Sequence, residues 1–135
     1  MGVGLQTEEI TGRARVLDAA AELFVRQGYV GTTLRQIAAA TGIKAGSIYH
    51  HFESKEALFV AVLNDGIVVM IDAFDEAQSS LAGTDDVAVH VREHVRSHLS
   101  AIFENGPYTT AHVTSFFSAP AEVRAAVVPK RDSYE

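Results

Sequence analysis

The most constraining feature of the sequence is residues 32–55, TTLRQIAAATGIKAGSIYHHFESK. Four of these residues recur at helical spacing behind a pair of threonines that can cap a helix: Leu34, Ile37, Ala38 and Thr41. Gly42 follows them, and glycine reaches the left-handed conformation that ends a helix without steric cost. The pattern therefore predicts a helix from about residue 34, a tight turn over 42–44, and a second helix over about 45–50.

The second predicted helix divides into an inward and an outward side. Ile48 is expected to face inward, and Phe52 to fill the core just behind it. The outward side chains are donors and flat rings: Lys44, Ser47, Tyr49, His50 and His51. Such groups bind guanine edges, thymine methyl groups or phosphates when a helix enters the major groove. The stretch is thus typical of a DNA-binding helix-turn-helix, although any small helical domain contains a turn of this kind.

Residues 28–58, GYVGTTLRQIAAATGIKAGSIYHHFESKEAL, resemble the DNA-binding domain of TetR-family transcriptional repressors. The residues that carry this resemblance stand in one register: Gly28, Tyr29, Thr32, Thr33, Ile37, Ala38, Gly42, Gly46, Tyr49, His51, Phe52, Ser54, Lys55 and Glu56. With the first helix, the resemblance covers roughly residues 11–62. It implies an all-α chain with a three-helix DNA-binding domain over residues 8–55. A helical effector-binding and dimerisation domain would follow over 56–135, entered by a connector helix over 54–80.

The resemblance also implies a function and a set of DNA contacts. The expected protein is a cytoplasmic repressor that leaves a palindromic double-stranded operator when a small apolar or acyl-type effector binds its second domain. DNA contacts are expected from Thr33, Arg35, Lys44, Ala45, Gly46, Ser47, Tyr49, His50, His51 and Lys55. The family usually continues with two more helices that pair in a homodimer, so we expect a chain truncated at its C-terminus. The alternative is a helical protein-interaction or metal-sensing module on the same fold.

Charge is divided unevenly along the chain, whose net charge is −6 at pH 7. Residues 1–60 hold six basic and six acidic side chains, whereas residues 61–135 hold five basic and eleven acidic ones. A neutral first part joined to an acidic second part fits a DNA-binding domain next to one that does not touch DNA. Because a neutral domain gains little from phosphates, we expect two linked copies to be needed for tight binding.

Several protein classes are disfavoured by the sequence. The absence of cysteine rules out disulfides and thiolate metal sites, and the N-terminus has neither a secretion signal nor a myristoylation motif. Ser47, His51 and Glu53 lie close in sequence but lack a nucleophile turn, so we expect no enzyme activity and no cofactor. The apolar residues 58–74 are interrupted by Asn64, Asp65, Gly66 and Asp72, so we expect them to fall short of a membrane span.

Helical periodicity continues on either side of the motif. A first helix is predicted from Glu8 or Thr11 to Gln27, and Gly66 is expected to mark a bend or a close helix contact in the connector. A helix over 87–105, capped by Thr84 or Asp85, carries an apolar face. Further inward-facing residues are expected beyond Pro107: Val113, Phe116, Phe117, Val123, Val127 and Tyr134. Pro129 is expected to kink or end the last helix.

Histidines and aromatic residues in the second part suggest an effector site. The candidate lining residues are His94, His98, Phe103, Tyr108, His112, Phe116 and Phe117, with plain core packing as an equally good interpretation. His90, His94 and His98 are spaced four apart, which is compatible with metal binding. A histidine row without an identified third ligand more often lies at the edge of a core, so we predict no metal site.

Overall fold

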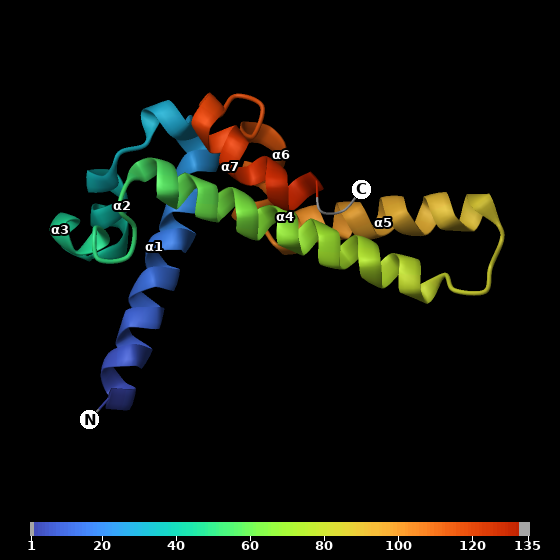
Figure 1. Cartoon of the computed structure of the whole chain (residues 1–135), viewed down its shortest axis with the longest axis horizontal. Coiled ribbons are helices and arrows are strands. Elements are labelled where there is room, and N and C mark those ends of the chain that lie inside the picture. Colours follow the sequence, from blue (N-terminus) through green and yellow to red (C-terminus); the bar gives the residue numbers. More distant parts are fainter. Residues whose placement is uncertain (1, 133–135) are drawn as a thin grey trace.

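The computed structural model describes residues 2–132, and every regular element in that range is a helix (Figure 1). The helices are α1 (Gly2–Gly31), α2 (Leu34–Thr41), α3 (Ala45–Ile48), α4 (Lys55–Ser80), α5 (Val87–Glu104), α6 (Pro107–Ser115) and α7 (Ala121–Asp132). The predicted all-α class is therefore confirmed. One hydrophobic cluster extends from α1 through α2, α3 and α4 to α6 and α7. The boundary expected near residue 55 thus crosses a continuous core, and the division into domains 8–55 and 56–135 stays a prediction.

Local signals in the sequence set the ends of the first helices. α1 is interrupted at Gly28, whose φ of 74° lies in the left-handed region. The interruption falls directly after the predicted end of the first helix at Gln27. The helix begins at Gly2, however, and not at Glu8 or Thr11. α2 opens with a capping box in which Thr33 and Gln36 exchange hydrogen bonds, and it ends at Gly42 with a φ of 68°.

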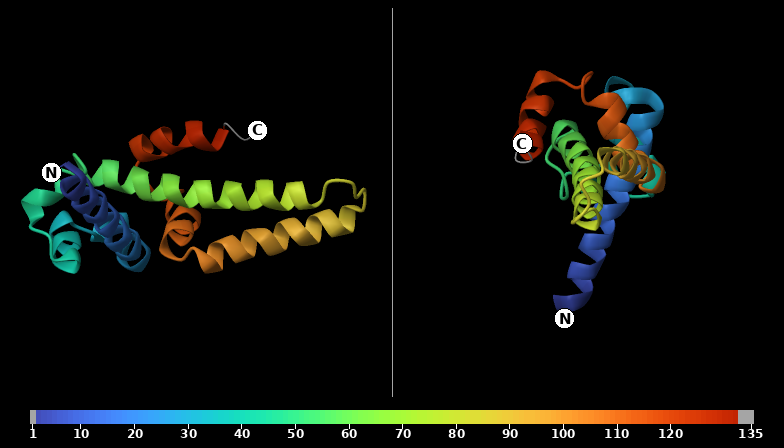
Figure 2. Two further views of the ribbon diagram at one scale, coloured as in Figure 1. Left: turned by 90° about the horizontal axis from the view of Figure 1, so that it is seen from below. Right: turned by 90° about the vertical axis from the view of Figure 1, so that its right-hand side faces the viewer.

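α4 passes from the N-terminal helices into a hairpin with α5 that projects away from the rest of the molecule (Figures 1 and 2). Ser54 caps it by accepting a 3.0 Å hydrogen bond from the amide of Ala57, so a single helix spans the predicted range 54–80, and its role as a connector between domains stays a prediction. Its first half is buried at Leu58, Phe59, Val62 and Leu63. Gly66 is a close helix contact, since a Cβ there would collide with the carbonyl oxygen of Tyr108 in α6.

By length and composition alone, α4 is long and apolar enough to cross a membrane. The expectation that its polar residues would disqualify it on those grounds was therefore wrong. A core helix of a soluble protein passes the same test, and the first half of α4 lies in the core that α1, α6 and α7 share. The physical reason is that a few polar residues lower the mean hydropathy of an otherwise apolar helix too little to disqualify it.

α5 packs against α4 through small side chains. Ser97 donates a 2.7 Å hydrogen bond from its hydroxyl to the carbonyl of Ala73, and Ala77 and Ala101 are buried in the same contact. The N-terminal cap is Asp86, whose carboxylate accepts from the amides of residues 88 and 89, and not Thr84 or Asp85. Of the apolar face expected on this helix, Val87, Val91, Val95 and Leu99 are exposed, and Ile102 is half-buried.

α6 and α7 cover α4 near its first half, and α6 also lies against α1. Phe116 is buried as predicted, whereas Val113 and Phe117 are exposed, so their expected inward orientation was wrong. In α7, Val123 and Val127 are buried as predicted, and Tyr134 lies outside the described residues. The helix continues to Asp132 with Pro129 inside it, so this proline does not end the helix.

Candidate nucleic-acid interface

α3 is a single helical turn held at a fixed angle by its neighbours. Its α-helical part spans residues 45–48, shorter than the 45–50 predicted, and hydrogen-bonded turns continue the chain. The amides of His51 and Phe52 both donate to the carbonyl of Ile48 at 2.9 Å. Ile48 is fully buried and Phe52 is 6% exposed, which confirms the predicted inward side. The guanidinium of Arg13 in α1 lies 4.9 Å from the Phe52 ring centroid and covers that ring.

Most of the predicted DNA contacts lie on the outside of this unit. The exposed members are Thr33, Arg35, Lys44, Ala45, Gly46, Tyr49 and His50, and the half-buried members are Ser47, His51 and Lys55. Tyr49 leaves 59% of its surface exposed directly after the buried Ile48. Gly46 has open space where a side chain would stand, so another molecule can approach this turn closely. We call Lys44, Ala45, Gly46, Tyr49 and His50 the recognition surface.

His51 is partly used inside the protein. A Cβ added at Gly12 of α1 would lie 3.1 Å from Nε2 of His51, so the imidazole rests against the α1 backbone. Because Gly12 has no side chain, there is room for the His51 ring. The contact holds the C-terminal end of the α3 turn against α1, and the expected phosphate contact by His51 stays a prediction.

Lys55 has an internal role that sequence reasoning missed. Its ammonium donates to the carbonyls of Tyr29 at 2.9 Å and Thr32 at 3.1 Å, and it lies 4.1 Å from the Tyr29 ring centroid. The first turn of α4 is thereby joined to the link between α1 and α2. Two of the three ammonium donors are engaged, which leaves one for the phosphate contact that was expected and stays a prediction.

Tyr29 completes this joint from the other side. Its hydroxyl donates a 2.7 Å hydrogen bond to Glu56, and its ring stacks on Phe59 with centroids 4.8 Å apart. Burial and the bond to Glu56 raise the pKa of the Tyr29 phenol, and the bond from Tyr29 lowers the pKa of the Glu56 carboxyl. Tyr29, Lys55 and Glu56 all stand in the sequence motif, and that shared register was the available signal for their contact.

The seven predicted effector-lining residues do not surround one cavity. His112 and Phe116 are buried in the core, with Nδ1 of His112 3.0 Å from the carbonyl of Leu63. Phe103 and Phe117 are 80% and 78% exposed. The hydroxyl of Tyr108 donates to Asp18 of α1. Their role toward an effector stays a prediction, but one enclosed site made by all seven is not present in this conformation.

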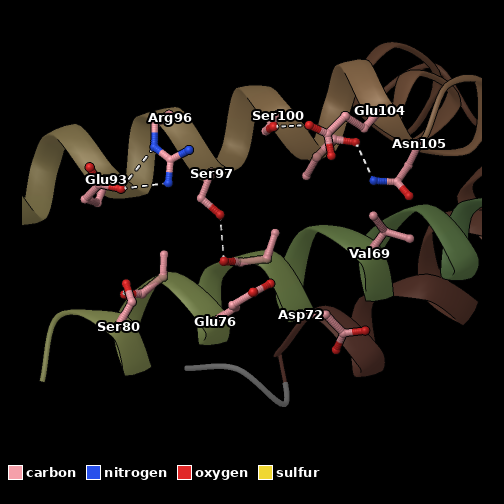
Figure 3. Close-up of a pocket in the computed structure, with 13 residues that line it drawn as sticks. Val69, Asp72, Glu76, Ser80, Glu93, Arg96, Ser97, Ser100, Glu104 and Asn105 are labelled. Atoms are coloured by element: carbon pink, nitrogen blue, oxygen red, sulfur yellow. Dashed lines mark hydrogen bonds and ion pairs between the residues drawn. The ribbon is translucent and has the colours of Figure 1, made fainter.

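A groove of about 520 Å³ lies instead between α4 and α5 (Figure 3). None of the seven predicted residues lines it. Its lining is Val69, Asp72, Ala73, Glu76, Ala77, Ser80, Glu93, Arg96, Ser97, Ser100, Ala101, Glu104 and Asn105. Arg96 is paired with Glu93 at 2.9 Å, so the other carboxylates make the α4–α5 groove acidic. Sequence reasoning missed it because it forms where two separately predicted helices diverge.

Two members of the histidine row, His90 and His94, lie within hydrogen-bond distance of backbone carbonyls in α5 or in the loop before it. Nε2 of His90 lies 2.8 Å from the carbonyl of Thr84, and Nδ1 of His94 lies 2.8 Å from the carbonyl of His90. The rings of His90 and His94 stack with centroids 6.2 Å apart, and His94 also contacts Phe74. Within residues 2–132 the structure places no three histidine, aspartate or glutamate side chains together in a metal-binding group.

The helix-turn-helix motif matches a known protein family. Residues 16–62 match the family model described as bacterial regulatory proteins, tetR family. A curated relative, the HTH-type transcriptional repressor AcnR of Corynebacterium efficiens, is 34% identical over 76 residues, which are 56% of this chain and 40% of AcnR. The chain therefore spans well under two thirds of that relative.

Two solved structures resemble nearly the whole chain. AibR, crystallised with isovaleryl coenzyme A and operator DNA, is 26% identical with a TM-score of 0.71, over 91% of this chain and 65% of AibR. The superantigen PfiT is 33% identical with a TM-score of 0.68, over 91% of this chain and 64% of PfiT. The matched residues 16–62 include the second half of α1, all of α2 and α3, and the start of α4. By that match, residues 16–62 form a domain of the tetR family of bacterial regulatory proteins, and the chain as a whole is similar in fold to AibR and PfiT.

Proposed function

We propose that the protein is a DNA-binding transcriptional repressor whose recognition surface reads an operator in the major groove. The observation that carries the proposal is the division of the α3 turn. Ile48 and Phe52 are buried, while Lys44, Tyr49 and His50 point away from the core. An ammonium, a phenol and an imidazole on one rigid turn suit phosphates and base edges.

Rigidity of this turn supports specificity. α3 is fixed by Ile48 and Phe52 in the core, by His51 against α1, and through Lys55 by the joint to Tyr29 and Thr32. Side chains held by packing need little ordering when DNA binds, so less binding free energy is lost to entropy. The fold alone does not decide the function, because PfiT shares it under a different description. The chemistry of the recognition surface is what favours DNA.

We further propose that the chain acts as a homodimer and releases DNA when an effector binds beyond the DNA-binding domain. The shared helix α4 supports this proposal, since its first turns belong to the N-terminal core and its second half lines the α4–α5 groove. AibR, a protein of similar fold, is described in complex with both an acyl coenzyme A and operator DNA. A small apolar or acyl-type effector for this chain is an extension from that protein.

The test is selection of duplexes by the purified chain from a random-sequence pool, followed by fluorescence anisotropy with the recovered duplex and a shuffled duplex. We expect preference for the recovered sequence and affinity that falls steeply with salt, because phosphate contacts release counterions. Absence of any enriched sequence would contradict DNA reading and favour a protein-interaction module on the same fold.

Sedimentation tests the homodimer separately. We expect two chains on one duplex, because two half-sites a helical turn or more apart are bound together only when the DNA-binding domains are linked. Linkage of this kind raises affinity by a factor of about 10² to 10⁴. One chain per duplex, with affinity equal to that of an isolated half-site, would contradict a dimeric repressor.

A further inference from the structure

Tyr108 is the residue at which three helices meet. It lies in the first turn of α6, and its hydroxyl donates a 2.5 Å hydrogen bond to Oδ1 of Asp18 in α1. Its carbonyl oxygen presses on Gly66 in α4, where no other residue leaves enough room. A shift of Tyr108 therefore cannot occur without a response from both α1 and α4.

The corner between α5 and α6 holds Tyr108 to the end of α5. Gly106 turns the chain with a φ of 58°, and Thr109 is fully buried beneath the corner. The Thr109 hydroxyl donates to the carbonyls of Ile102 at 3.1 Å and Gly106 at 3.2 Å. Because the bond to Ile102 joins α6 to α5, the start of α6 moves with the last turn of α5.

That last turn of α5 is one wall of the α4–α5 groove. Ala101, Glu104 and Asn105 line the groove, opposite residues of α4 (Figure 3). Asn105 lies only three positions before Tyr108. Anything that widens or narrows the groove at this end therefore displaces Tyr108 through the rigid corner.

On the far side of the hydrogen bond, α1 leads to the recognition surface. Asp18 is one helical turn from Arg15, whose guanidinium donates to the carbonyl of Thr41 at the end of α2. Gly42 follows Thr41 and begins the turn into α3. The contacts thus run without interruption from the groove wall to the turn that orients α3.

We propose that Tyr108 is a positioning residue that couples the width of the α4–α5 groove to the orientation of α3, by way of Asp18 and Arg15 in α1. The inference rests on the proposed function and adds a second connection beside the shared helix α4. Burial and the neighbouring Asp18 carboxylate raise the pKa of the Tyr108 phenol, so this donor keeps its proton at neutral pH.

The test uses the absence of native cysteine in the chain. Ala39→Cys on α2 and Ala88→Cys on α5, both exposed positions, carry a pair of spin labels that report the distance between the DNA-binding helices and the hairpin. Tyr108→Phe removes only the hydroxyl, and Asp18→Ala removes the carboxylate that accepts its hydrogen bond. Thr114→Ala is the matched control, because its hydroxyl bonds the carbonyl of Thr110 within α6 itself.

We expect Tyr108→Phe and Asp18→Ala each to broaden or shift the label distance and to weaken binding of the selected duplex. The expected loss is about two- to tenfold, the ratio that one hydrogen bond of ordinary net strength sets. The double variant should be no worse than either single variant, because both remove the same bond. Thr114→Ala should leave distance and affinity as in the parent.

An unchanged distance distribution in both single variants would overturn the coupling, and so would fully additive losses in the double variant. If either variant fails to fold, the other still removes the bond and decides the question. If the parent chain selects no DNA, the proposed function fails while the label distances still test the coupling. The two proposals are therefore distinguishable.

Discussion

The DNA-binding helices and the α4–α5 hairpin use the same amphipathic pattern with opposite results. In α2 and α3 the apolar residues Ile37, Ala38 and Ile48 are buried, and polar or aromatic side chains face outward. In α5 the apolar residues recur at every fourth position and all remain exposed: Val87, Val91, Val95, Leu99 and Phe103. The exposed fraction reaches 73% at Val87 and 80% at Phe103.

The difference lies in what each helix packs against. α2 and α3 pack on α1 and α4 through large apolar side chains. α5 instead packs on α4 through serine, alanine and the ring of His94, and its valines at 87, 91 and 95 are exposed. Periodicity shows that a helix has an apolar face, but it does not show which element covers that face. An apolar face has a strong effect on stability only where other side chains close over it.

The sharpest test of this contrast exchanges a phenylalanine for alanine in each region. Phe52→Ala should lower the free energy of unfolding by about 3 to 5 kcal/mol, because it empties a packed site in a small core. Phe103→Ala should change it by less than about 0.5 kcal/mol, because the ring is already in solvent. Denaturant unfolding measures both, and equal losses would show that the two side chains are packed equally well.

Two glycines give the next contrast. Gly66→Ala should cost about 1 to 3 kcal/mol, because its new methyl group collides with the backbone of Tyr108 and α6 must shift. Gly46→Ala meets nothing within 4 Å and should leave thermal stability unchanged or slightly raised, since alanine favours a helix. A melting curve for Gly66→Ala that matches the parent would mean that α6 is free to move away from α4.

On the recognition surface the effect should fall on binding and not on stability. Tyr49→Ala and Lys44→Ala should each weaken binding of the selected duplex by about 1 to 3 kcal/mol if the side chain contacts a base, and by less for a phosphate. Circular dichroism should show the parental helical content, because both side chains are exposed. Unchanged affinity in both variants would remove α3 from the interface.

The smallest expected effect is a pH dependence at the joint between α1 and α4. The hydrogen bond from Tyr29 lowers the pKa of Glu56 below its ordinary value of 4.5. The stability it contributes is therefore present above that value and is lost as the pH falls through the lowered pKa. With Glu56→Gln, the free energy of unfolding, measured by urea unfolding, should fall less as the pH is lowered. The difference from the parent should be a few tenths of a kcal/mol, because the pair is so exposed. The same loss of stability at low pH in the variant and the parent would show that the bond contributes nothing.

Helix boundaries in the motif were determined largely by the sequence itself. Thr33, Gly42 and Ser54 act through their own backbone neighbours, so caps and stops were predictable at Leu34, Thr41 and Lys55. The inward positions of Ile48 and Phe52 followed from spacing in the same way. These features depend on contacts a few residues apart, which the sequence lists directly.

Tertiary structure alone decided the features that join distant residues. Tyr108 was expected to line an effector cavity, but its hydroxyl reaches Asp18, ninety positions earlier in the chain. Lys55 was expected on phosphate, yet it first binds carbonyls of the α1–α2 link. The exposure of the α5 valines and the position of the α4–α5 groove likewise depend on how α4, α5 and α6 pack. Such outcomes depend on the packing angles and distances between whole helices, and side-chain periodicity does not specify these quantities.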